Sequence, residues 1–192
     1  MLTPRRIFAL LLLAALWLSP LPRLATGSMV LHMVLHLSVT VMVPALLAFR
    51  LPLPNSAVWL AAGAIMEAVI VWAWHLPSLH VWARMTTTGF VLEQASFLLA
   101  GLLLWTSVRS AGNFGGAIVL LVTTMHMTLL GALIGLAPRL LYGSFCAGYL
   151  GLDALEEQQI AGILMAGAGG AMYLAAALRR IWLALETSEA FA

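Results

Sequence analysis

Residues 114–137 read FGGAIVLLVTTMHMTLLGALIGLA, a stretch without a single Lys, Arg, Asp or Glu. A helix needs about 20 consecutive apolar residues to cross the hydrocarbon core of a bilayer, and this stretch is long enough. Asn113 precedes it and Pro138 follows it, so residues that favour helix ends stand on both sides. The stretch therefore predicts a transmembrane helix.

The same pattern recurs along the chain, and prolines such as Pro22, Pro52 and Pro77 separate the apolar segments. The sequence therefore predicts an all-α fold, a polytopic transmembrane helix bundle of about six helices, or five if the first is a cleaved signal. We expect the bundle to cover residues 28–180 and a short cytoplasmic tail to cover 181–192. The predicted segments are 7–18, 28–49, 56–76, 89–108, 114–137 and 159–178.

The composition also points to a membrane. Of the 192 residues, 63% are hydrophobic and 8% are charged, whereas a soluble domain carries about 25% charged residues. A globule of this composition could not cover its surface with polar groups, so we expect the lipid bilayer to cover the surplus apolar surface. All basic residues are arginines, spread singly or in pairs, which does not indicate a nucleic-acid partner.

Residues 1–27 allow two interpretations. Arg5 and Arg6 precede a short apolar run, and residues 25–27, Ala-Thr-Gly, resemble a cleavage site, which is typical of a signal peptide. The alternative is a short first membrane helix that stays attached. Prolines and an arginine just before the site are unusual for a signal, so we favour the retained helix.

The arginines indicate the orientation, because cytoplasmic loops carry an excess of basic residues. With a cytoplasmic N-terminus, six arginines fall inside and three outside, and the opposite orientation reverses this ratio. We therefore predict that both termini are cytoplasmic and that loops 77–88 and 138–158 lie outside. The inner set is Arg5, Arg6, Arg50, Arg109, Arg179 and Arg180, and the outer set is Arg23, Arg84 and Arg139.

Histidines are the main candidates for chemistry. Polar groups inside a membrane are costly and usually mark a site. In the predicted orientation all but one of the histidines lie near the outer face, so we expect one shared site. The structural alternative is a ring bonded to a backbone carbonyl or lying at the headgroup level. The five are His32, His36, His75, His80 and His126.

His32 and His36 stand four residues apart, so both imidazoles lie on one helix face and can bind one ion. Met29 and Met33 lie on the same side. Thioether beside imidazole favours Cu(I) over harder metals. His126, in contrast, stands between two methionines that cannot share its face, so at least one of these two is expected to fill the core.

Acidic residues and the single cysteine provide further candidates. Glu67 and Glu93 fall within predicted spans. Each is expected either as a protonated carboxyl bonded to a neighbouring helix, or as a proton path or partner of a ligating histidine. Cys146, in an outer loop, is either a soft ligand or an ordinary apolar residue. Acids before the last segment are expected to cap that helix: Asp153, Glu156 and Glu157.

Motifs of common enzymes were not found. The sequence has no phosphate-binding glycine loop, no Cys-x-x-Cys, no His-Glu-x-x-His and no Gly-x-Ser-x-Gly. We therefore expect no enzymatic activity.

Three stretches together resemble the CtaG family of cytochrome c oxidase assembly factors. They are residues 32–44, which begin His-Met-Val-Leu-His, residues 74–77, Trp-His-Leu-Pro, and residues 152–165. Residues 92–105 also fit, although Gln94 stands where the family is expected to carry a histidine. The resemblance implies a protein of the bacterial inner membrane that acts in the maturation of a haem-copper oxidase. Its implied partners are oxidase subunits and periplasmic copper chaperones.

From the residues and the resemblance together we expect an assembly factor that holds Cu(I) near the outer face and delivers it to an oxidase subunit. The expected primary ligands are His32 and His36, and the site is completed by His75 or His126. The accessory residues are Met33, Glu93 and Cys146. The resemblance also carries over Gln159.

Two other functions stay open at this point. One is a haem-binding membrane electron carrier, with His36 and His126 ligating one haem from different helices. The other is a metal-free scaffold that escorts oxidase subunits.

Overall fold

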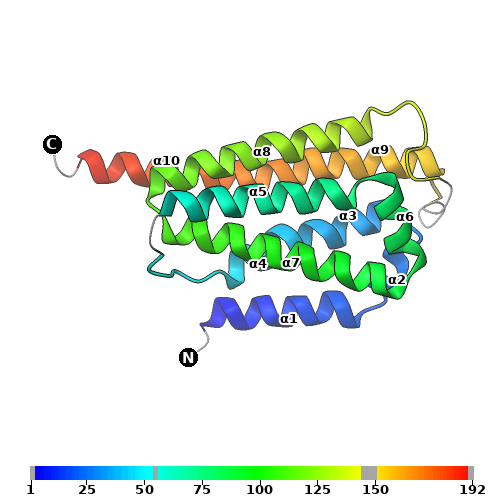
Figure 1. Ribbon diagram of the computed structural model, residues 1–192, viewed down its shortest axis with the longest axis horizontal. Coiled ribbons are helices and arrows are strands. Elements are labelled where there is room, and N and C mark those ends of the chain that lie inside the picture. The colour runs from blue at the N-terminus through cyan, green and yellow to red at the C-terminus, as the bar shows by residue number, and fades with distance from the viewer. Residues whose placement is uncertain (1–2, 54–55, 144–150, 190–192) are drawn as a thin grey trace.

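The protein is a bundle of helices that run along one axis. The structure, a computed structural model, describes residues 3–53, 56–143 and 151–189. All regular elements in these ranges are helices, and five continuous helices are long and apolar enough to cross a membrane. The short helices α2 (Leu21–Ala25) and α6 (Pro77–Met85) lie at one end, and both termini lie at the other (Figure 1). The predicted all-α transmembrane bundle is confirmed.

Four of the five spans end within two residues of the predicted segments, and the last, predicted over 159–178, is longer at both ends. The first runs through α3 (Met29–Leu37), a π-helical turn (Ser38–Met42) and α4 (Val43–Leu47). Then follow α5 (Ser56–Trp74), α7 (Thr87–Ser110) and α8 (Asn113–Gly135). The last runs through α9 (Ala154–Leu164), a second π-helical turn (Met165–Gly169) and α10 (Gly170–Glu189).

Helix α1 (Pro4–Leu18) corresponds to the first predicted segment, 7–18, and has 15 residues. At 1.5 Å per residue it is about 22 Å long, shorter than the roughly 30 Å hydrocarbon core of a bilayer. It lies along the outside of the bundle (Figure 1), where it contacts α4.

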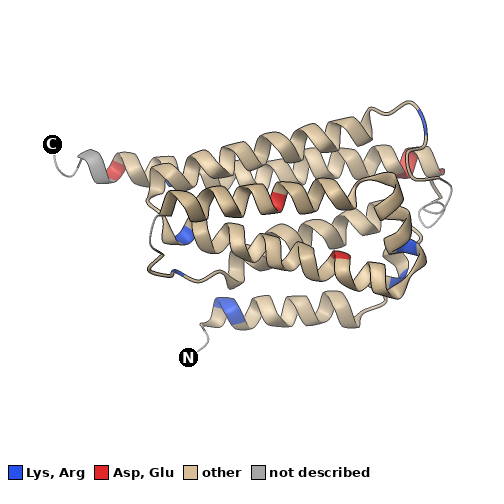
Figure 2. Ribbon diagram, viewed as in Figure 1, with Lys and Arg blue, Asp and Glu red and all other residues tan. Residues whose placement is uncertain are grey.

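Charge and exposure fit a lipid environment. Arginines and acidic residues lie mostly toward the two ends of the bundle (Figure 2). Large apolar side chains are exposed on its flanks, for example Leu99 and Ile163, each with 65% of its surface accessible. Water would penalise such a surface, so these flanks face hydrocarbon.

The first span changes its hydrogen-bonding pattern around Pro44. Proline has no N–H to donate to the carbonyl of Thr40, four residues earlier, and residues 38–42 form the π-helical turn just before it. Gly101 of α7 lies against this turn, and a Cβ there would come within 2.7 Å of Pro44 Cγ. The two helices therefore cross at close range because residue 101 has no side chain.

Helices α8 and α9 touch backbone to backbone through glycines. A Cβ at Gly131 would lie 2.7 Å from the carbonyl oxygen of Gly162, and a Cβ at Gly162 would lie 2.5 Å from Gly135 Cα. Gly167, Gly169 and Gly170 also fall inside the last predicted span, where small residues are expected to form packing surface. Gly169 and Gly170 do pack, against Leu37 and Thr128, whereas a Cβ at Gly167 would meet no atom within 4 Å.

A buried acid connects the start of α3 to α9. Ser28 caps α3 by accepting from the Leu31 N–H, and its hydroxyl donates to Glu157 Oε2 at 2.6 Å. Glu157 also accepts from the Val30 N–H at 3.3 Å. Of the three acids expected to cap α9, Asp153 and Glu156 form a capping box there. Glu157 instead accepts hydrogen bonds from Ser28 and Val30 at the N-terminus of α3.

Replacing Ser28 by Ala is therefore expected to destabilise the protein by about 1–3 kcal/mol, because α3 loses its cap and a buried carboxylate loses a donor. Thermal unfolding in detergent measures the change. Ser19→Ala is the control, because the Ser19 hydroxyl bonds only exposed backbone near α1. Equal stability of the two variants would contradict this role of Ser28.

Candidate metal centre

Four histidines meet at the end of the bundle that carries α6. His32 and His36 come from α3, His75 follows the last residue of α5, and His80 lies in α6. Their ring centroids lie 4.9 Å apart for His32–His80, 5.2 Å for His36–His75 and 6.0 Å for His32–His75. All four are buried, with at most 4% of their surface accessible. We refer to these four residues as the histidine cluster.

Proline 77 explains how His75 and His80 reach the cluster. A residue before proline avoids the helical conformation, and Leu76 is extended, with φ −66° and ψ 133°. The chain therefore turns after His75, and α6 starts with Pro77 at its first turn, a favoured position for proline. His80 follows three residues later and packs on Tyr142, with ring centroids 4.4 Å apart.

Ring nitrogens of the cluster lack hydrogen-bond partners. Nε2 of His32, His36 and His75 and both nitrogens of His80 are buried without one. Leaving a buried polar group unbonded costs about 1–3 kcal/mol. A cation held by Nε2 of His36 or His75, or by a nitrogen of His80, would offset that cost, so these residues fit a metal.

The contacts of the other ring nitrogens indicate which lone pairs are free. His75 Nδ1 lies 2.7 Å from the carbonyl oxygen of Val71, so Nδ1 donates and Nε2 keeps a lone pair. His32 Nδ1 lies 2.7 Å from Arg84 Nη1. Arginine only donates, so this Nδ1 accepts and the proton sits on Nε2. Arg84 therefore occupies the lone pair of His32.

Arg84 also forms a buried ion pair with Glu93 of α7. Gln94 donates to the same carboxylate oxygen at 3.2 Å. One possible ligand atom from each of His32, His80 and Glu93 lies within 4.8 Å of the other two, and the guanidinium of Arg84 contacts two of these residues. The positive charge beside the cluster is thus balanced by Glu93.

The histidines outside the membrane spans are held in the neutral form. Burial lowers the pKa of His75 from 6.5 to about 4, although its bond to the Val71 carbonyl raises the pKa in part. Burial also lowers the pKa of His80 well below its usual value, and the charge of Arg84 lowers it further. A neutral imidazole has a lone pair for a metal at pH 7.

The structure brings together three of the four predicted ligands, His32, His36 and His75, and places Glu93 beside them. Their binding of metal stays a prediction. Met33 is fully buried on α3, and Cys146 lies outside the described residues. Gln159 is half-buried, while its neighbour Gln158 is buried and binds the carbonyl of Arg139.

His126 is not brought to the histidine cluster. It lies on α8, where its Nε2 is 2.7 Å from Glu67 Oε2 of α5. Tyr173 of α10 donates to the other oxygen of Glu67 at 3.2 Å. Glu67 thus accepts a hydrogen bond from α10 and lies at ion-pair distance from α8, and which of its two predicted roles it has stays open.

Sequence reasoning did not assign Arg84 to the site and did not name His80 as a ligand. His80 was included only among the five histidines expected to share one site, and Arg84 was noted only as a charge outside the membrane. The available signal was that His80 and Arg84 stand four residues apart in the segment that begins at Pro77. This spacing places both side chains on one face of a short helix.

Comparison with protein families agrees with the resemblance noted in the sequence. Residues 59–186 match the family described as cytochrome c oxidase caa3 assembly factor (Caa3_CtaG). The matched region is two thirds of the chain and includes His75, His80, Arg84 and Glu93. The chain has no match among curated proteins or solved structures. The chain belongs to the cytochrome c oxidase caa3 assembly factor family.

Proposed function

We propose that this protein holds a copper ion, as Cu(I), at the histidine cluster and passes it to a subunit of cytochrome c oxidase. Membership of the family makes an oxidase its partner. The observation that carries the copper proposal is the group of buried ring nitrogens without hydrogen-bond partners. The four rings come from three parts of the fold, α3, the end of α5 and α6. Among the described residues, the possible ligand atoms that lie within 4.8 Å of one another belong to His32, His80 and Glu93.

The charges around the cluster favour a monovalent cation. Coulomb repulsion from the nearby guanidinium of Arg84 grows with the charge of the ion, and the only carboxylate beside the cluster, in the described part of the chain, is paired with that guanidinium. Imidazole suits copper as well as harder metals, and buried Met33 on the same helix adds a soft neighbour. These features support Cu(I) as cargo.

We further propose that the cluster faces the periplasm of a bacterial inner membrane and that both termini are cytoplasmic. The excess of arginines at the end that carries the termini supports this orientation. Periplasmic copper chaperones would then be the source of the ion. Labelling of a cysteine introduced into α6 from outside intact cells would test the orientation, and labelling only after lysis would contradict it.

The copper proposal predicts that the double variant His32→Ala, His36→Ala and the double variant His75→Ala, His80→Ala each lose the bound ion. The measurement is copper stoichiometry of the detergent-purified protein after loading with Cu(I) and washing with a chelator. His126→Ala is the matched control and should keep wild-type copper, because His126 pairs with Glu67 away from the cluster. Unchanged copper in both double variants would remove the proposal.

The same purified sample tests the two other functions considered from the sequence. A haem carrier would show a Soret band, and the close packing of the four rings leaves no slot for a macrocycle between them. A metal-free scaffold would support oxidase assembly in cells even when all four histidines are replaced. Loss of assembly together with loss of copper is the result we expect.

A further inference from the structure

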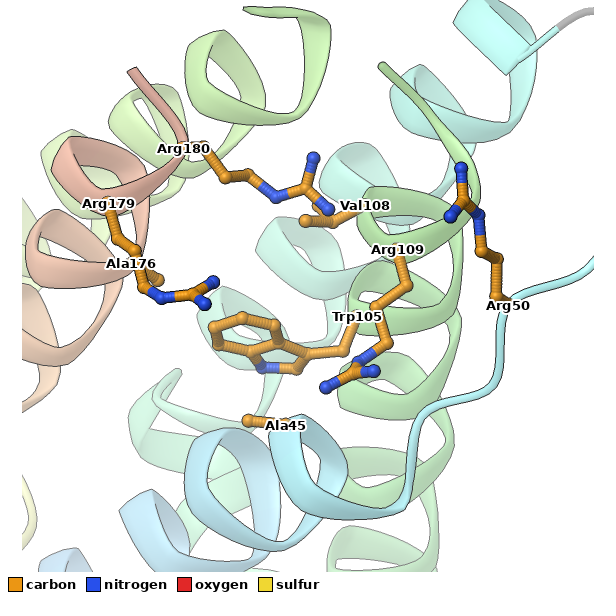
Figure 3. A pocket seen from close by; sticks show the side chains of 8 residues that line it. All are labelled: Ala45, Arg50, Trp105, Val108, Arg109, Ala176, Arg179 and Arg180. Carbon is orange, nitrogen blue, oxygen red and sulfur yellow. The ribbon is translucent and has the colours of Figure 1, made fainter. Parts of the chain in front are cut away.

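A cavity of about 360 Å³ opens at the end of the bundle away from the histidine cluster. Its lining includes Arg50 from the segment after α4, Arg109 from α7, and Arg179 and Arg180 from α10 (Figure 3). Residues from three spans thus bring four guanidinium groups to one cavity. We refer to it as the arginine pocket.

The charges of the arginine pocket are not balanced by carboxylates. In residues 3–53, 56–143 and 151–186, none of these four side chains forms an ion pair. Arg180 donates only to the carbonyl of Gly112, at 3.3 Å. Like charges held in one cavity repel each other, and an anion bound among them would remove that cost.

Two further features show that the pocket is built around polar groups. Trp105, with only 9% of its surface accessible, lines it, and its indole Nε1 is buried without an acceptor. Figure 3 shows this ring between the guanidinium groups of Arg109 and Arg179. Gly116 provides space for Arg180, because a Cβ there would lie 2.6 Å from its Nη1. An anion in the pocket could accept from the indole N–H.

We propose that the arginine pocket binds the phosphate headgroup of an anionic phospholipid. Guanidinium groups form paired hydrogen bonds with phosphate oxygens. Arg109 stands one residue before the end of α7, and Arg50 follows the end of α4 by three residues, so the pocket lies at the depth of lipid headgroups. Basic pockets between membrane helices recognise such lipids, and the half-buried Ala45 in the lining offers apolar surface to the glycerol backbone.

Native mass spectrometry of the detergent-purified full chain, with phosphatidylglycerol or phosphatidylcholine added, tests the proposal. We expect phosphatidylglycerol to bind at least about tenfold more tightly, which equals one charge-assisted hydrogen bond or more. The double variant Arg109→Gln, Arg179→Gln should lose this preference. Trp105→Phe keeps all charges and should weaken it by about threefold, as expected for one hydrogen bond.

The matched control is Arg23→Gln with Arg139→Gln, which removes the same charge from exposed sites at the other end. It should retain the preference, and equal loss in both double variants would overturn the proposal. Displacement of the lipid by an equal concentration of inorganic phosphate would identify free phosphate as the ligand instead. If the pocket variant keeps its lipid preference but no longer copurifies with the oxidase, an acidic segment of the partner is the occupant and the lipid proposal fails.

Discussion

Replacing Glu93 by Gln is expected to destabilise the protein by about 3–5 kcal/mol, because one partner of a buried ion pair is removed and the other charge is left unbalanced. Glu93 is fully buried, and the guanidinium of Arg84 has 1% of its side-chain surface accessible. The variant should also lose bound Cu(I), because the unpaired guanidinium would repel a cation at the histidine cluster. Denaturant unfolding in detergent micelles and copper stoichiometry are the two measurements.

The double variant Arg84→Met, Glu93→Gln separates charge balance from any other effect of residue 93. Replacing both members of a buried pair by uncharged side chains of similar size is often close to neutral. We expect the double variant to recover most of the stability and its copper, since His32 Nδ1 then has no guanidinium beside it. A double variant as unstable as Glu93→Gln alone would show that the pair is not the source of the effect.

Replacing Gly162 by Ala is expected to cost about 2–3 kcal/mol, although alanine is the better helix former by about 1 kcal/mol. The new methyl group would lie 2.6 Å from the Gly131 carbonyl oxygen and 2.5 Å from Gly135 Cα. These are backbone atoms, which cannot turn aside as a flexible side chain can. Helices α8 and α9 would have to separate, and thermal unfolding in detergent would report the loss.

Gly167→Ala is the control for this prediction. Residue 167 belongs to the same span, yet a Cβ there meets no atom within 4 Å. This variant should be as stable as the wild type or slightly more stable, because glycine is unfavourable in a helix. If both alanine variants were equally harmful, the close approach of α8 and α9 could not be the reason.

Much of the fold could be predicted because its signals are local. The uncharged run at 114–137 and its flanking Asn113 and Pro138 predicted α8 to within a few residues. Other boundaries moved for reasons beyond hydropathy. The last span starts at Ala154 instead of residue 159, since Asp153 and Glu156 form a capping box that extends the helix into a polar stretch.

The histidine cluster could be predicted in part. Spacing on one helix brought His32 and His36 together, and the expected membrane orientation added His75. The rotation of α8 about its axis could not be inferred in the same way, because its sequence is apolar on all sides. His126 was therefore grouped with the other histidines, whereas its ring faces Glu67. His126 lies beside this buried carboxylate of α5 instead of joining the histidine cluster.

The ion pair between Arg84 and Glu93 affects how a Cu(I) ion would leave the histidine cluster. Both charges of the pair belong to the protein itself, so they balance each other whether or not a metal ion is bound to the imidazoles. In the part of the chain that the structure describes, no unpaired carboxylate lies beside the cluster, so a bound Cu(I) would be held there by nitrogen lone pairs. A receiver that offers thiolates, which are negative and softer, would then draw the ion away without a proton, a reductant or a nucleotide.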